Sequence, residues 1–513
     1  MDTFIASLEM ISRWDVLLAL LVGSIGGVII GAIPGVGAAI AIAILLPATF
    51  SMEPIVGLTL LLGVYASSMF GGAIPAVLIN TPGTAVNALT TYNGYPMTQR
   101  GEAARALALS YGASFCGGVI SIIALMTLTP LLASIAPMFG SREIFLAALL
   151  GMILVVISHR GQTLVAAAML FLGIFINTIG LESITYSKRY TFDQSWLASG
   201  VNLIVVILGL FALSQAFLLL VGKDTKKPTP DIKNGLFKGL WEVFRYPKVL
   251  LPSSLFGVIM GIIPGVGEFL SQFFAYSFAQ KVSKKPELFG KGSPEGLVAS
   301  EAANNAVPPA AMIPLLALGI PGEALTAMML SVFHVHNVVP GPILFRDQPE
   351  FVMSLFLCML ILNVLVIIFL MISTKPLLKM IKIPDRFLGM VILCLAFVGV
   401  YSLRNSATDC LIAAVFGIFG FILKRLNLPI VPIILGMVLG GIAETKLRTS
   451  MARVDTPLEF IERPIAAVLF TLILVSISAH IYSMLKDRQK RLQHEARLTE
   501  LESSTKSNKE EYK

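Results

Sequence analysis

The sequence has little charge. Only 13% of its 513 residues are Asp, Glu, Lys or Arg, whereas soluble proteins carry about 25%. Charge is absent from long runs, among them 16–52, 54–99, 106–141 and 351–374. A membrane span needs about 20 apolar residues, so several runs are long enough for two spans. With 56% hydrophobic residues and no alternating short strands typical of a barrel, the chain is predicted to be an all-α, polytopic membrane protein.

Cysteine and histidine are also scarce. The four cysteines stand singly in apolar surroundings, without a CxxC spacing, so we interpret them as small core residues. His334 and His336 are two residues apart, would not share a helical face and have no third ligand nearby, so they do not favour a metal site. The sequence contains no Walker motif and no nucleophile beside a base. We therefore expect no cofactor, no metal and no enzymatic activity.

Signals of broken helices are what the sequence does contain. The motif Ile-Pro-Gly-Val-Gly occupies 33–37 inside one apolar run and recurs at 263–267 inside another. Asn-Thr-Pro-Gly at 80–83 and Gly-Ile-Pro-Gly at 319–322 each follow a further proline at the same spacing. In hydrocarbon, broken backbone survives only where protein or a wet cavity satisfies it. Paired breaks in two halves favour a transporter binding site, although proline and glycine also kink or closely pack membrane helices.

The polar residues of these breaks are the candidate binding residues. Helix N-termini and freed N–H groups bind anions without a buried arginine, and freed carbonyl groups bind cations. Asparagine side chains offer both donors and acceptors, which suit carboxylates or Na⁺, although interhelical hydrogen bonds are an alternative role. The predicted substrate- or ion-binding residues are Pro34, Gly35, Gly37, Ser67, Asn80, Thr81, Pro82, Gly83, Thr84, Asn87, Pro264, Gly265, Gly267, Glu301, Asn304, Asn305, Pro321 and Gly322.

Three acids border apolar segments, namely Glu268, Glu301 and Glu323. An acid at membrane depth is a functional hypothesis by default, because burying it is costly. One of them is a candidate to carry a coupling proton or to help bind Na⁺. For Glu268 and Glu323, a position at the membrane interface is the competing interpretation.

Basic residues and the repeated motifs divide the chain. Lys and Arg gather in short loops and at the C-terminus, as the positive-inside rule describes, and residues 1–15 have no basic region typical of a cleavable signal peptide. The predicted parts are a first membrane repeat (1–222), a basic cytoplasmic linker with an interfacial helix (223–248), a second membrane repeat (249–463), a final transmembrane helix (464–485) and a polar cytoplasmic tail (486–513). The segments that end the two halves, 223–248 and 486–513, both look cytoplasmic. Inverted repeats allow this only if 464–485 stands outside the repeat. We favour that arrangement over parallel repeats, because inverted repeats explain alternating access more directly.

The combined motifs resemble one family of transporters. The doubled Ile-Pro-Gly-Val-Gly, the tip at 79–83, and Glu301-Ala-Ala-Asn304-Asn305-Ala followed by Ile-Pro-Gly-Glu at 320–323 are similar to the TctA family. That family is the large permease subunit of bacterial tripartite tricarboxylate transporters. The resemblance implies a small four-helix membrane subunit of TctB type, a periplasmic solute-binding protein of TctC type, and uptake driven by Na⁺ or H⁺. It also implies organic carboxylates as substrates and the bacterial inner membrane as the location.

The sequence thus predicts a secondary active symporter of organic carboxylates. We expect a helical bundle with two structural repeats, in which broken helices and re-entrant hairpins move against more uniformly apolar helices in an elevator-like manner. The alternative is an ion or carboxylate channel, or a carrier that works without a binding protein. A channel would need a continuous polar pore, whereas the polar residues here cluster at the breaks.

Overall fold

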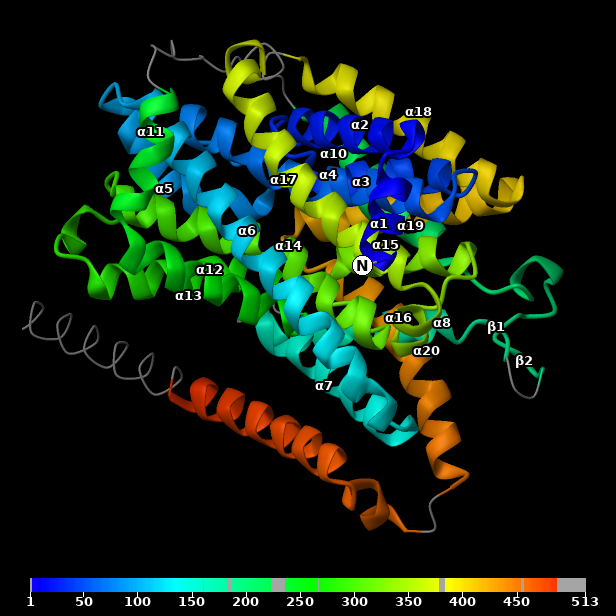
Figure 1. Ribbon diagram of the computed structural model, residues 1–513. Helices are drawn as coiled ribbons and strands as arrows, with labels where there is room; N and C mark the ends of the chain where they lie inside the picture. Colours follow the sequence, from blue (N-terminus) through cyan, green and yellow to red (C-terminus); the bar gives the residue numbers. More distant parts are fainter. Residues whose placement is uncertain are drawn as a thin grey trace, which may run out of the picture.

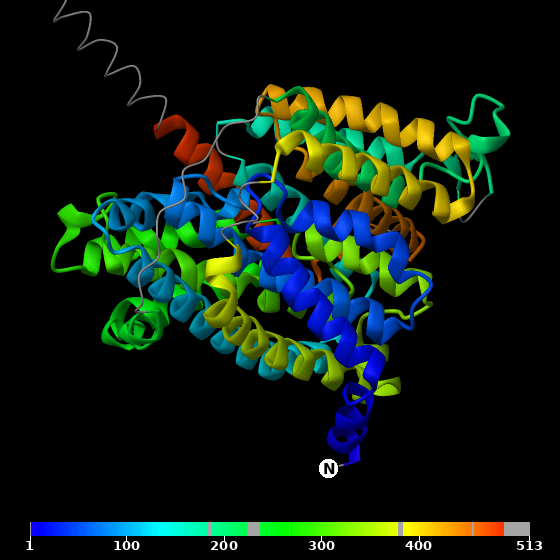
Figure 2. The ribbon, with the colours of Figure 1, turned by 90° about the horizontal axis from the view of Figure 1, so that it is seen from above.

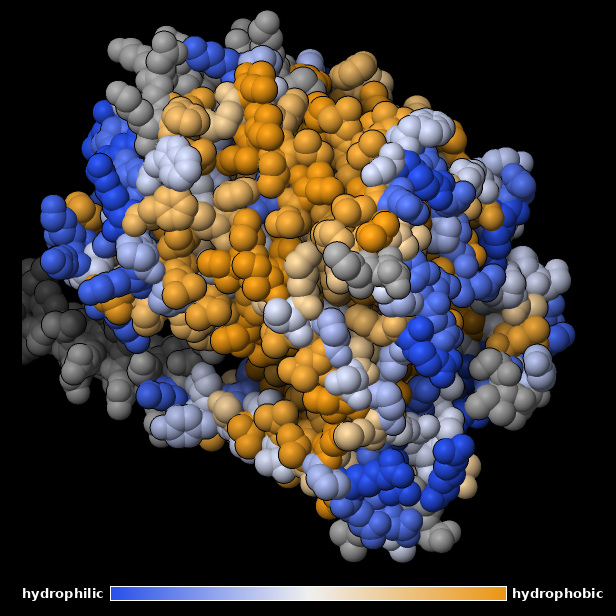
Figure 3. All heavy atoms as spheres, in the orientation of Figure 1, coloured by the Kyte–Doolittle hydropathy of each residue, from blue (hydrophilic) through white to orange (hydrophobic). Residues whose placement is uncertain are grey.

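The computed structural model describes residues 2–159, 161–182, 186–222, 236–265, 267–377, 383–453 and 456–486. Within these ranges nine helices are long and apolar enough to cross a membrane, and the predicted all-α polytopic bundle is confirmed. Figure 1 shows the helices packed side by side. Figure 3 shows a broad hydrophobic surface on one face, with hydrophilic side chains gathered toward its two ends.

The first half of the chain supplies ten α-helices and a small hairpin. The hairpin consists of β1 (Gly180–Leu181) and β2 (Lys188–Arg189), which pair antiparallel between helices. The helical elements are α1 (Asp2–Ile11), α2 (Trp14–Gly31), α3 (Gly37–Thr49), α4 (Pro54–Ile79), η1 (Ala85–Asn87), α5 (Ala88–Gln99), α6 (Ala103–Ile135), α7 (Ser141–Ser158), α8 (Thr163–Asn177), α9 (Leu203–Ile207), the π-helical η4 (Leu208–Leu213) and α10 (Ser214–Val221).

The second half repeats the plan. Its helices are α11 (Leu236–Glu242), α12 (Pro247–Ile262), α13 (Gly267–Val282), α14 (Pro294–Leu318), α15 (Ala324–Val335), α16 (Pro342–Asp347), α17 (Pro349–Leu377), α18 (Asp385–Arg404), α19 (Ala407–Arg425), α20 (Val431–Met451) and a C-terminal helix, Pro464–Lys486. Of the predicted linker, 223–235 lies outside the described residues. The rest of it forms α11, a short 3-10 turn and the first residues of α12.

Each Ile-Pro-Gly-Val-Gly motif separates two helices. In the first repeat α2 ends at Gly31 and α3 begins at Gly37, and in the second repeat α12 ends at Ile262 and α13 begins at Gly267. The backbone between them enters the left-handed region that glycine tolerates best. The φ angles are 83° at Gly35 and 63° at Gly37, against 81° at Gly265 and 65° at Gly267. The glycines of the two breaks therefore have nearly the same φ angles.

Small residues bring the broken helices close to their neighbours. A Cβ atom on Gly27 would lie 2.0 Å from Ser67 Oγ, and one on Gly257 would lie 2.4 Å from Ala306 Cβ. The first pair joins α2 to α4, and the second joins α12 to α14. Glycine at such positions lets two membrane helices approach closely. The same close packing thus occurs in both repeats.

The long helices after the broken pairs run in opposite directions. Tyr111 Oη lies 3.2 Å from Thr374 Oγ1, whereas a Cβ atom on Gly118, two turns further along α6, would meet the side chain of Asn363, earlier in α17. Because later residues of α6 contact earlier residues of α17, the two helices are antiparallel. This is the relation that inverted repeats require. Figure 2 shows α6 and α17 on one flank of the broken helices and α18 with α19 on the other.

The flanking helices are exchanged between the repeats. In α20, Gly436 approaches the backbone of Leu170 in α8, so a helix of the second repeat packs on α7 and α8 of the first. Conversely, Gly209 in η4 approaches Ala413 in α19, so the first repeat's α9–η4–α10 segment packs on α18 and α19. Each flank therefore contains helices from both repeats, which ties the halves together.

The C-terminal helix stands apart from this exchange. It contacts α7 through Ala466 and Ile473, which pack on Leu146, and most of its surface is exposed. In Figure 1 it lies along the edge of the bundle. Residues 487–513 of the predicted polar tail lie outside the described residues.

Candidate functional site

Two helical hairpins end in tips, which are the turns that follow α4 (80–84) and α14 (319–323). A cavity of about 670 Å³ lies where the two breaks and these two hairpin tips meet. It brings together predicted site residues from both repeats. Those that line it are Gly35, Gly37, Pro82, Gly83, Thr84, Gly265 and Gly267. The cavity thus joins, in one place, elements that are far apart in the chain.

Matching main-chain hydrogen bonds hold the breaks against the tips. The N–H of Gly35 donates to the carbonyl of Gly83 over 3.1 Å, and the N–H of Gly265 donates to the carbonyl of Gly322 over 2.7 Å. These bonds satisfy one freed donor in each motif, as a buried backbone requires. Gly322 therefore belongs to the second tip even though it is not among the lining residues.

The tips themselves are built alike. α4 and α14 end on residues in the left-handed conformation, Asn80 with φ 55° and Gly319 with φ 70°. The next N–H groups, of Thr81 and Ile320, donate back to the carbonyls of Pro75 and Pro314 over 3.3 Å each. The equal spacing of the two prolines in the sequence thus corresponds to the same turn. By this register, Thr84 in the first repeat is equivalent to Glu323 in the second.

Several helices point their N-termini at the cavity. α3, α13 and α15 begin at the lining residues Gly37, Gly267 and Ala324, and Thr84 lines the cavity just before η1 and α5. A helix N-terminus carries about half a positive charge and unpaired N–H donors. Their convergence makes the cavity suitable for an anion.

Lys424 and Gln215 line the cavity and were not predicted from the sequence. Lys424 Nζ donates to Gln215 Oε1 over 3.1 Å and lies 3.3 Å from the carbonyl oxygen of Phe211. A Cβ atom on Gly35 would lie 3.4 Å from Gln215 Nε2, so this pair stands beside the break of the first repeat. In the sequence, Lys424 next to Arg425 resembles an ordinary basic end of a membrane helix. Only the fold brings it to the cavity.

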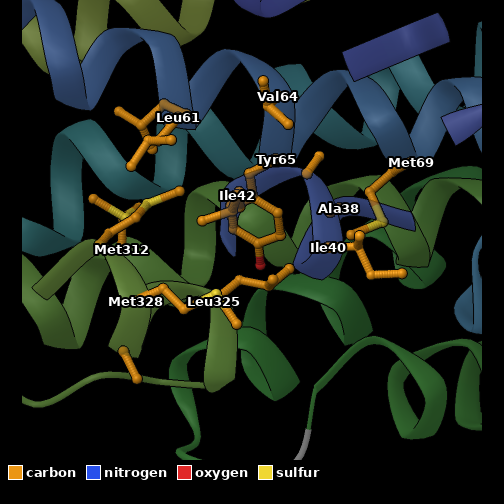
Figure 4. Close-up of a cluster of buried hydrophobic side chains, with 14 of the residues drawn as sticks. Ala38, Ile40, Ile42, Leu61, Val64, Tyr65, Met69, Met312, Leu325 and Met328 are labelled. Atoms are coloured by element: carbon orange, nitrogen blue, oxygen red, sulfur yellow. The ribbon is translucent and has the colours of Figure 1, made fainter. Parts of the chain in front are cut away.

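Glu268 and Glu323 also line the cavity, beside Gly267 of the second break, and are both buried. Glu323 Oε1 has no hydrogen-bond partner among the described residues, and Oε2 would lie 3.9 Å from a Cβ atom on Gly267. Glu268 Oε1 accepts a hydrogen bond of 3.4 Å from the hydroxyl of Tyr65. Figure 4 shows the Tyr65 ring in an apolar cluster with Ile40, Ile42 and Leu325. The carboxylate of Glu268 is therefore held beside an apolar part of the cavity wall.

Glu301 lies away from the cavity, in an enclosed polar cluster between α5, α6 and α14. Its Oε1 accepts hydrogen bonds from the side chains of Thr90 and Asn87, and its Oε2 accepts one of 2.9 Å from Ser114. Asn305 Nδ2 donates to Ser114 Oγ over 2.7 Å. Asn87 Oδ1 also accepts a hydrogen bond from Thr84, which lines the cavity. The cluster therefore connects the first hairpin tip to α14.

The remaining predicted site residues have other surroundings. Asn304 Oδ1 accepts a hydrogen bond of 3.1 Å from Gln272, and Ser67 Oγ donates to carbonyls of Gly23 and Gly63. Neither residue lines the cavity. The others that do not line it are Pro34, Asn80, Thr81, Asn87, Pro264, Glu301, Asn305, Pro321 and Gly322.

Two curated proteins of Agrobacterium vitis are similar to this chain. The "Uncharacterized 52.8 kDa protein in TAR-I ttuC' 3'region" is 34% identical over 450 residues, covering 87% of this chain and 89% of its own length. The "Uncharacterized protein in TAR-II ttuC' 3'region" is 37% identical over 223 residues, covering 43% of this chain and 92% of its own length. No solved structure matches the chain.

The family comparison covers both breaks and both tips. The family described as "Tripartite tricarboxylate transporter TctA family" matches residues 17–435, from α2 into α20. That range also includes Lys424, Glu268 and Glu323. The chain is a multi-pass membrane protein and belongs to the tripartite tricarboxylate transporter TctA family.

Proposed function

We propose that the protein takes up organic carboxylates across the bacterial inner membrane by cation-driven symport. The observation that carries this proposal is the single cavity shared by both breaks, both tips and Lys424. Its volume of about 670 Å³ lies within the ordinary range for small-ligand sites, about 300–1,000 Å³. Membership of the TctA family supports a tricarboxylate as the kind of substrate.

The cavity provides two kinds of group for a carboxylate. Helix N-termini at Gly37 and near Thr84 supply N–H donors and partial positive charge. When protonated, Lys424 supplies a positive charge, and the Gln215 side chain supplies further polar atoms. A molecule with two or three carboxylates can use both at once. An uncharged solute of the same size would bring no charge opposite to that of Lys424.

A second hollow supports a route through the protein. It measures about 750 Å³ and is lined by residues of α15 and α20 that lie further along both helices than those at the first cavity. At α15 the lining passes from Ala324 and Leu325 to His334, and at α20 from Val431 and Leu435 to Lys446. The same two helices thus line both spaces. An elevator-like movement of the broken helices against the flanking helices would join them alternately.

The partners follow from the family rather than from the geometry. We propose a small membrane subunit of TctB type and a periplasmic binding protein of TctC type that delivers the carboxylate. Energy comes from the Na⁺ or H⁺ gradient, since a membrane potential of 100 mV supplies about 2.3 kcal/mol per charge. The chain itself performs no chemistry on the substrate.

Reconstitution of the chain with its candidate partners in proteoliposomes tests this function. Uptake of radiolabelled citrate and other di- and tricarboxylates is measured with a Na⁺ gradient alone and with a pH gradient alone. We expect accumulation under at least one gradient and only when the binding protein is present. Accumulation without the binding protein favours a stand-alone carrier, and a conductance far above carrier turnover favours a channel. No transport of any carboxylate would refute the proposal.

A further inference from the structure

We propose that the coupling cation binds at Glu268 and Glu323, beside the break of the second repeat, while the substrate carboxylate binds near Lys424 and Gln215, beside the break of the first. This inference rests on the proposed function and names the ion site within it. Its basis is the unequal distribution of charged side chains over two breaks whose glycines have nearly the same φ angles.

The two repeats differ at equivalent positions of their tips. Thr84 precedes η1 in the first repeat, and Glu323 precedes α15 in the second. The break of the second repeat is followed by Glu268, in the first turn of α13, whereas the break of the first is followed by Ala38. The first repeat therefore presents N–H donors and a hydroxyl group. The second presents two carboxylates.

Glu323 is prepared for a ligand that the protein itself does not supply. Its side chain is buried, lines the cavity and has an oxygen without a partner among the described residues. A buried carboxylate needs a cation, a proton or hydrogen-bond donors to offset the loss of water. The N-terminus of α13 lies close to it, since a Cβ atom on Gly267 would be 3.9 Å from Glu323 Oε2. Glu268, the next residue, accepts a long hydrogen bond of 3.4 Å from Tyr65.

The lysine of the cavity stands beside the other break. Lys424 contacts Gln215, and Gln215 lies beside Gly35 of the first break. His159 also lines the cavity but stands beside the second break, since its Nδ1 is 2.8 Å from the carbonyl oxygen of Val155, and a Cβ atom on Gly265 would lie 2.8 Å from Val155 Cα. Among the described residues, the titratable groups facing the cavity are thus Glu268 and Glu323 with His159 and Lys424, and Tyr65 at Glu268. Anion and cation can therefore bind beside different breaks of one cavity.

The charge balance explains why transport would be coupled. With both carboxylates ionised and Lys424 protonated, these three side chains sum to one negative charge, which repels a carboxylate substrate. One bound cation makes the sum zero, and a second makes it positive. Each ligand therefore favours the binding of the other, and thermodynamic linkage makes the effect reciprocal. Either Na⁺ or H⁺ satisfies this requirement, because both neutralise a carboxylate.

The test uses Glu268→Gln and Glu323→Gln in the full-length chain, with Glu287→Gln as the control. Glu287 is an exposed glutamate in the turn after α13 and lies outside the cavity. One arm measures binding of ²²Na⁺ to the purified chain in the absence of substrate. The other arm measures citrate accumulation under a pH gradient without Na⁺, together with citrate counterflow, which needs no gradient.

Two results agree with the proposal and identify the ion. If the ion is Na⁺, the cavity variants lose at least tenfold in ²²Na⁺ affinity and the control does not. If the ion is H⁺, the cavity variants lose at least tenfold in accumulation but keep counterflow, because glutamine resembles the protonated acid. Wild-type behaviour of both variants in both arms would overturn the inference. If the wild-type protein transports no carboxylate substrate, the proposed function fails, but the measurement of ²²Na⁺ binding still tests this site.

Discussion

The amide of Gly265 donates to the carbonyl of Gly322 over 2.7 Å, and the amide of Gly35 donates to that of Gly83 over 3.1 Å. Each bond fixes a helix break against the hairpin tip of its own repeat. Because the bonds match, the cavity walls are symmetric in their backbone. The backbone packed around the two tips is not equally close, however, and this difference leads to the first prediction.

Alanine at Gly83 is expected to be far more disruptive than alanine at Gly322. A Cβ atom on Gly83 would lie 2.1 Å from the oxygen of Gly31 and 2.6 Å from Gly72 Cα, whereas one on Gly322 would lie no closer than 3.1 Å, from the oxygen of Gly261. Backbone clashes of the first kind cannot be relieved by a side-chain rotation. We expect Gly83→Ala to destabilise the protein by more than about 3 kcal/mol and Gly322→Ala by about 1 kcal/mol or less.

Thermal unfolding of the two variants in detergent measures this difference. Both replacements add the same methyl group at equivalent positions, so each is the control for the other. Equal shifts of the unfolding midpoint would contradict the close approach of Gly83 to α2 and α4.

Replacement of Glu301 is expected to affect folding more than substrate affinity. Glu301→Ala leaves the hydroxyl donors of Thr90 and Ser114 without their acceptor in a buried cluster, whereas Asn87 Nδ2 keeps the carbonyl of Met69. Unpaired buried donors cost about 1–3 kcal/mol each, so we expect a loss of more than about 2 kcal/mol. Glu301→Gln keeps one acceptor oxygen and should lose less.

The measurements are the unfolding midpoint and the KM for carboxylate uptake of the protein that remains folded. An unchanged midpoint with a KM raised tenfold or more would instead place Glu301 at the substrate.

The docking of α11 on α6 is expected to weaken in acid. Arg105 Nη2 lies 2.6 Å from Glu242 Oε1 in α11, and hydrogen bonding to Arg105 lowers the pKa of Glu242 below its ordinary 4.5. A lowered pKa means that the stabilisation is present above about pH 4.5 and is lost as the pH falls through the folded-state value. Arg105 is partly exposed, so salt screens the pair and its contribution is modest.

Hydrogen exchange of residues 236–242 between pH 6 and pH 4, corrected for the intrinsic rate, reports this loss. Glu242→Gln should exchange faster at pH 6 and respond less to acid. A Glu242→Gln variant with wild-type protection at pH 6 would show that the apolar contacts of α11 hold it without the ion pair.

The backbone of the site was predictable from the sequence because proline and glycine report local geometry. The positions of Gly35 and Gly265 follow from their motifs, since a membrane helix cannot continue through Pro-Gly without a partner for the freed groups. The matching proline spacing likewise predicted two equivalent tips, which end on Asn80 and Gly319. Local rules were sufficient for these elements.

Side chains that reach the site from distant helices were not predictable in this way. Lys424 has the sequence context of an interfacial lysine and reaches the cavity because α19 packs on η4 of the other repeat. Conversely, Asn304 and Asn305 stand out in the sequence because they are polar in an apolar run, and each uses one side-chain atom to pair with Gln272 or Ser114. Asn304 Nδ2 and Asn305 Oδ1 have no partner among the described residues, so their role as site residues stays a prediction. Polarity at membrane depth indicates that a partner is needed, but not whether the partner is a ligand or another helix.

Lys424 therefore provides the most direct test of the substrate side of the cavity. We expect Lys424→Gln to raise the KM for di- and tricarboxylates about 10- to 100-fold, because a hydrogen bond to a charged group is worth about 1.5–3 kcal/mol. The matched control is Arg425→Gln, which removes the neighbouring positive charge. The guanidinium group of Arg425 stacks on the Phe421 ring, and Arg425 does not line the cavity. Its KM should stay within about twofold of wild type. If both variants lose affinity, Lys424 acts only through the overall charge of the helix end. If neither loses affinity, Lys424 does not contribute. In either case, the carboxylate must be held by the helix N-termini alone.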